Sequence, residues 1–146
     1  MPVFSQRSLA RLATCHPDLQ TLLLDVIKTH DCTILEGARP REKQAEYRAS
    51  GRSKVSWPNS NHNVDGVRRT TSWAVDVAPY PIDWHDHARF VAFARYVLAT
   101  AKALRAQGRM TYEVRWGGDW DRDGDHRDER FFDGPHFELL GVPDGQ

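Results

Sequence analysis

The sequence is poor in cysteine, in excess charge and in long apolar runs, and each shortage excludes a class of protein. Cys15 and Cys32 are too few for a disulfide framework or a four-cysteine zinc site, so we expect two buried thiols. Twenty basic residues balance twenty acidic ones, which argues against a general electrostatic grip on nucleic acid. No apolar stretch has the length of a signal peptide or of a membrane span.

The rest of the composition suits one compact domain. The 146 residues are 40% hydrophobic, include five tryptophans and contain no visible linker or repeat, so we expect a single domain over 1–146. Apolar periodicity predicts an α+β fold, a small antiparallel sheet flanked by helices, with residues 50–71 as a long loop. The helices are expected over 17–29, 41–50 and 86–108, and the strands over 32–39, 72–78, 111–118 and 136–140.

Three residues stand out as candidate metal ligands. Strand alternation puts His136 and Glu138 on one face, and it puts Asp76 between two small alanines on an otherwise apolar strand. A buried carboxylate needs a partner or a metal, although an edge-strand aspartate facing solvent would read the same way. His62 lies in the long loop, where a histidine is more often exposed than a ligand.

These residues also form a pattern. The segments "SNH", "AVD" and "DGPHFEL" resemble the S-x-H…A-x-D…[DE]-x-x-H pattern of the VanY-like zinc peptidases, and "ILEGAR" and "RWGGDW" extend the resemblance over 18–141. That family includes D-Ala-D-Ala carboxypeptidases, dipeptidases and phage L-alanyl-D-glutamate endolysins. The aspartate of "DGPH" resembles the endolysin branch. The resemblance implies a VanY/Hedgehog-like zinc peptidase fold.

The resemblance also implies a site. It assigns zinc to His62, Asp76 and His136, which leaves a fourth position open for water. Asp133 would be the general base, and Arg39 would stabilise the carbonyl oxygen as it becomes negative. Glu138 remains the rival base, because it shares a strand face with His136.

One departure from the family pattern concerns the loop between the first two ligands. Asp76 follows His62 by fourteen residues, a longer spacing than the family normally keeps. We expect the extra segment to bring Arg68 and Arg69 to the mouth of the cleft, where they would bind a substrate carboxylate. Ser60, the serine of the motif, is a further expected substrate contact.

An acidic segment precedes the last motif. Its D-x-D-x-D-G start is typical of an EF-hand loop, but its glutamate falls at position eleven instead of twelve and neither flank reads as a helix. We therefore expect a calcium loop of another kind, since its carboxylates would repel one another without a cation. The alternative is a solvated acidic turn. The expected ligands are Asp119, Asp121, Asp123, Asp125 and Glu129.

The resemblance implies a zinc-dependent endolysin that cuts the L-Ala–D-Glu bond of peptidoglycan, and the acidic segment adds the expectation that calcium regulates it. We expect a monomer without membrane insertion or a separate wall-binding domain, made in the host cytoplasm and released by a holin. The alternatives are a D-Ala-D-Ala carboxypeptidase and a non-enzymatic, calcium-dependent wall-binding module. A non-haem Fe(II) oxygenase is less favoured, because its usual H-x-D ligand pair is absent.

Overall fold

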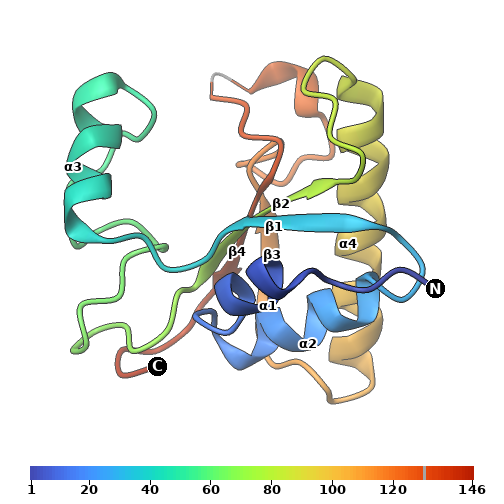
Figure 1. Cartoon of the computed structure of the whole chain (residues 1–146), viewed down its shortest axis with the longest axis horizontal. Helices are drawn as coiled ribbons and strands as arrows, with labels where there is room; N and C mark the ends of the chain where they lie inside the picture. Colours follow the sequence, from blue (N-terminus) through green and yellow to red (C-terminus); the bar gives the residue numbers. More distant parts are fainter. Residues whose placement is uncertain (130) are drawn as a thin grey trace.

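A four-stranded antiparallel sheet forms the centre of the molecule (Figure 1). The computed structural model describes residues 1–129 and 131–146. The strands lie side by side in the order β1-β2-β4-β3, so the two central strands are far apart in sequence. Their bounds are Cys32–Glu36 for β1, Ala74–Pro79 for β2, Glu113–Trp116 for β3 and His136–Leu140 for β4.

The helices are distributed unevenly around this sheet. The long helix α4 packs on β2, β3 and α2, whereas α1 packs on β1. Helix α3 projects to one side, at the left of Figure 1, and the long loop follows it in the sequence. The bounds are Gln6–Leu12 for α1, Pro17–Val26 for α2, Arg41–Ser50 for α3, His87–Ala106 for α4 and His126–Asp128 for the 3₁₀ helix η1.

The apolar faces of α2 and α4, which the periodicity predicted, lie against the hydrophobic core. On α2 this face includes Leu19 and Leu23, and on α4 it includes Phe93 and Val97, all of them buried. The prediction of an α+β domain with a small antiparallel sheet is confirmed. No helix in the described part of the chain is long and apolar enough to cross a membrane.

Two details depart from the sequence prediction. Helix α2 ends at Val26, because the residues after it form tighter turns. Helix α1 was not predicted, since its seven residues show little amphipathic pattern. Ser5 caps it, and Ser8 and Arg11 bond the backbone of Ile34 on β1, so tertiary contacts hold this short helix. Both cysteines are buried and free, as expected, and burial raises each thiol pKa to about 12.

Candidate metal centre and cleft

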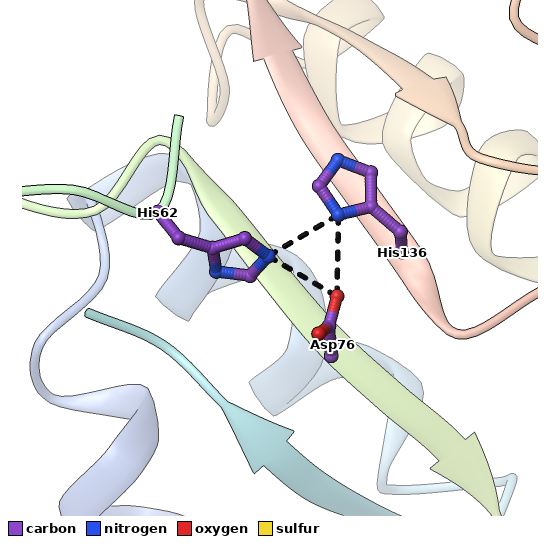
Figure 2. Close-up of side chains that lie close together, drawn as sticks. All are labelled: His62, Asp76 and His136. Carbon is purple, nitrogen blue, oxygen red and sulfur yellow. Dashed lines mark hydrogen bonds and ion pairs between the residues drawn. The ribbon is translucent and has the colours of Figure 1, made fainter. Parts of the chain in front are cut away.

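Three side chains converge at one point beside the sheet (Figure 2). The register of β2 and β4 sets Asp76 opposite His136, and the long loop brings His62 to the same place. His62 Nε2, Asp76 Oδ1 and His136 Nδ1 form a triangle with sides of 3.2 Å. We call these three residues the metal centre.

The triangle has the dimensions of a zinc site. Ligand atoms bound to tetrahedral zinc at ordinary Zn–N and Zn–O lengths lie about 3.3 Å apart. The outer nitrogen of each histidine also has a suitable partner, Gly37 O for His62 Nδ1 at 2.8 Å and Glu138 Oε1 for His136 Nε2 at 2.7 Å. Because these nitrogens donate outward, the inner nitrogens keep their lone pairs for a cation.

The electrostatics of the metal centre also favour a cation. Burial opposes ionisation of Asp76, yet the two histidines hold its pKa far below the ordinary value. Burial likewise lowers the pKa of His136, but Asp76 and Glu138 outweigh it and raise that pKa to about 10. A divalent cation bound here would replace the proton that these carboxylates otherwise stabilise.

Glu138 supports the metal centre from behind. Its Oε1 accepts from His136, and its Oε2 accepts from Arg115 at 2.8 Å and Asn61 at 3.0 Å. Both oxygens are therefore engaged, which argues against the rival prediction that Glu138 is the base. The side chains of Asn61 and Arg115 were not among the predicted site residues. Both could have been found as hydrogen-bond donors to Glu138, the carboxylate that shares a strand face with His136.

Close backbone contacts with Gly117 hold Asp133 beside the metal centre. Its backbone N–H donates to Gly117 O, and the Gly117 N–H donates to His136 O. A Cβ on Gly117 would lie 2.4 Å from Asp133 O, so only glycine permits this approach. Burial and the Asp76 carboxylate raise the pKa of Asp133, against the opposing charges of His136, His62 and Arg39.

The metal centre opens into two adjoining hollows, of about 490 Å³ and 280 Å³. Asp76 lines the larger hollow, and His62 and His136 line the smaller one. The larger hollow has a basic wall on and beside α3 and an aromatic wall that includes Trp84 and Phe90. Four residues line both hollows: Arg39, Arg52, Phe131 and Asp133. Together the hollows form one cleft across the metal centre.

Two further predicted site residues lie beside this centre. Arg39 is buried and donates through Nε and Nη2 to Glu36 Oε1, at 2.8 Å and 2.6 Å. Its Nη2 also lies 3.9 Å from Asp76 Oδ2. Ser60 lines the smaller hollow, and its Oγ accepts from the backbone N–H of His62 at 3.3 Å.

Arg68 and Arg69 do not stand at the mouth of the cleft, where we expected them. Arg69 is only 1% exposed, packs on the Trp73 ring and donates to Pro58 O and Asn61 Oδ1. Arg68 pairs with Asp144 on the surface. Neither lines the two hollows. The long loop folds over Arg69, and two loop oxygens, Pro58 O and Asn61 Oδ1, accept hydrogen bonds from its terminal nitrogens.

The acidic segment, residues 119–129, forms a second cluster of oxygen ligands that we call the acidic loop. Two groups of carboxylates have oxygens within 4.8 Å of one another: Asp119, Asp121 and Asp123, and also Asp121, Asp128 and Glu129. Asp125, an expected ligand, belongs to neither group, since it caps η1 and pairs with Arg127. Trp120 joins the loop to the metal centre, because its ring lies 5.2 Å from that of His136.

The family model, the relative and the solved structure that resemble this chain are all described as L-Ala–D-Glu peptidases. The sequence model of the phage L-alanyl-D-glutamate peptidase family matches residues 2–140. The L-alanyl-D-glutamate peptidase of Escherichia phage T5 is 32% identical over 146 residues, covering 94% of this chain and 97% of that protein. The crystal structure of the L-Ala D-Glu endopeptidase ChiX of Serratia marcescens has a similar fold. Its TM-score is 0.59 at 24% identity, over 94% of this chain and 90% of ChiX.

Proposed function

The chain belongs to the phage L-alanyl-D-glutamate peptidase family, and from this we propose that it hydrolyses the L-Ala–D-Glu bond of peptidoglycan at a zinc ion. The observation that carries the proposal is the triangle of two histidine nitrogens and one carboxylate oxygen at the floor of a cleft. His62, Asp76 and His136 would hold the metal and leave a position open. When bound, zinc lowers the pKa of water to about 7 and polarises a carbonyl group.

The residues around the metal centre would divide the remaining work. Asp133 lines both hollows, and its raised pKa suits a group that takes a proton from water and passes it to the leaving amine. Arg39 would stabilise the oxygen that becomes negative, because its guanidinium is already fixed by Glu36 beside Asp76. Ser60 would hold the substrate near His62.

The decisive experiment is digestion of purified peptidoglycan by the zinc-loaded protein, with mass spectrometry of the fragments. We expect new N-terminal D-glutamate and no release of free D-alanine. Release of D-alanine alone would instead support the carboxypeptidase alternative. Asp133→Ala and His136→Ala serve as inactive controls. Intact sacculi after treatment with metal-loaded protein would contradict an enzymatic role and would favour the wall-binding alternative.

We also propose that the acidic loop binds Ca²⁺ and thereby regulates the peptidase. The grouping of its carboxylate oxygens supports this, as does the repulsion among them, which a cation would relieve. Trp120 offers a route to the cleft, because its indole N–H donates to Phe131 O and its ring packs on His136. Activity at saturating zinc should then rise with Ca²⁺ and fall with EGTA. Activity indifferent to both would refute the regulation.

A further inference from the structure

Three cationic side chains gather around one tyrosine ring at the edge of the cleft. The guanidinium carbons of Arg52 and Arg39 lie 4.3 Å and 4.5 Å from the centre of the Tyr47 ring, and Lys43 Nζ lies 5.5 Å from it. Each cation gains from the face of the ring, but like charges this close repel one another. Such a gathering indicates a place where an anion binds.

The charges of this cationic group are only partly balanced within the protein. Glu36 neutralises two of them at once, with Oε1 2.6 Å from Arg39 Nη2 and Oε2 2.7 Å from Lys43 Nζ. Arg52 forms no ion pair and no side-chain hydrogen bond with any residue that the structure describes, and it is exposed. One guanidinium in the group is therefore free to bind an anion from outside.

Arg52 also lines the cleft. It is shared by both hollows, together with Arg39 and Asp133, so it lies where the two hollows adjoin. The opposite wall of the larger hollow is aromatic, with Trp84 and Phe132 among its residues. A carboxylate that enters the cleft therefore meets positive charge on the α3 side.

The substrate of the proposed reaction carries such a carboxylate. D-glutamate has two carboxyl groups, and at least one stays free whenever the residue is joined to the next residue through the other. This free carboxylate lies on the side of the amine that leaves when the L-Ala–D-Glu bond is cut. We propose that Arg52, stacked on Tyr47, binds the free carboxylate of D-glutamate and so selects the leaving group. The assignment rests on the proposed peptidase function.

The stacking geometry favours this role. A guanidinium that lies on a ring keeps its N–H groups directed outward in its own plane, where a carboxylate can accept two of them. Lys43 adds positive charge behind Arg52 but is held by Glu36, which raises the pKa of the Lys43 ammonium through their hydrogen bond. Arg52 is thus the residue whose removal should alter selectivity without disturbing the rest of the group.

The test compares two synthetic peptides that differ only at the free carboxyl group of D-glutamate, as carboxylate or as carboxamide. The zinc-loaded wild-type protein should cleave the carboxylate with about 10-fold higher kcat/KM, as expected for one hydrogen-bonded charge. Arg52→Gln should remove this preference by slowing cleavage of the carboxylate peptide alone, and Arg52→Lys should restore part of it. Arg48→Gln changes an exposed arginine in the last turn of α3 that lines neither hollow, and it should behave like wild type.

Three results would contradict the assignment. Equal cleavage of both peptides by the wild type would overturn it and leave the peptidase function intact, as would an Arg52→Gln variant slowed equally on both. Failure of the zinc-loaded wild type to cleave either peptide would overturn the proposed function and this assignment with it.

Discussion

The protein gathers candidate cation ligands in two places, and it builds the two clusters differently. In the metal centre the two histidines are buried, and their outer nitrogens are tied to Gly37 O and Glu138. In the acidic loop no carboxylate is fully buried, and most accept hydrogen bonds from the loop's own backbone, as Asp119 does from Gly124 N at 2.9 Å. The metal centre is held in place by the core, whereas the acidic loop is held mainly by hydrogen bonds within the loop.

The two clusters should therefore differ in how much they must reorder when they bind a cation. Strands, a buried loop and Glu138 hold the side chains of the metal centre in place, so binding a cation there would require little ordering. The acidic loop instead carries unrelieved repulsion, and contact with Asp123 raises the pKa of Asp128 to about 6. We therefore expect the metal centre to be required for catalysis and the acidic loop to adjust it.

The largest effect should follow loss of a ligand in the metal centre. Asp76→Asn or His136→Ala should abolish zinc retention and lower kcat/KM by at least about 1000-fold, because the metal supplies most of the charge stabilisation. Zinc content and peptide cleavage measure the two effects. Asp123→Asn in the acidic loop is the matched control and should keep its zinc. Retained activity in the Asp76 variant would remove the metal centre from the mechanism.

The next largest effect should come from the general base. Asp133→Asn should lower kcat by about 100- to 10,000-fold while zinc content stays unchanged, since only proton transfer is lost. Because the folded pKa of Asp133 is raised, the base is ionised only above that pKa. Accordingly kcat/KM should fall as the pH drops through a value above the ordinary aspartate pKa of about 3.9. An acid limb that persists unchanged in Asp133→Asn would assign it to another group.

An intermediate effect is expected for the residue behind His136. Glu138→Gln should lower zinc affinity about 10- to 100-fold, because it weakens the hydrogen bond that orients the imidazole. Competition with a chelator measures the affinity, and kcat at saturating zinc should change less than in Asp133→Asn. Glu113→Gln, on the neighbouring strand β3 and paired with surface arginines, is the control. Loss of kcat with full zinc affinity would revive Glu138 as the base.

The smallest effect is expected in the acidic loop. Asp121 belongs to both carboxylate groups, so Asp121→Asn should abolish the Ca²⁺-dependent rise in Tm while basal activity without calcium changes by less than about 10-fold. Asp125→Asn should keep the calcium response, since Asp125 pairs with Arg127 outside both groups.

The same loop should respond to pH. Calcium binding needs ionised Asp128, so affinity should weaken as the pH falls below about 6, which calorimetry at two pH values can measure. A calcium affinity independent of pH between 5 and 7 would exclude Asp128 as a ligand.

The strands were easier to predict than the loops, for a local reason. Alternation along "HFELL" and "SWAVDVAPY" placed His136 and Asp76 on definite faces, and the sheet register then set them opposite each other. Helix α1 was missed because its stability comes from docking on β1 and not from its own pattern. The position of Arg69 was predicted wrongly, because the adjacent sequence does not show that Arg69 would pack on Trp73 and bond Asn61.

The sequence alone determined which residues are candidate ligands and the strand faces that carry two of them, because side-chain direction in a strand depends only on position along it. It also set the spacing of Asp133 from His136. Only the tertiary structure decided that Glu138 bonds the candidate ligand His136 and that Arg69 is buried against Asn61 instead of standing at the cleft mouth. It likewise placed Arg52 over the Tyr47 ring, without an ion pair to any residue that the structure describes. Those roles depend on partners distant in sequence, since a buried or stacked charge takes whichever donors, acceptors and rings the fold brings to it.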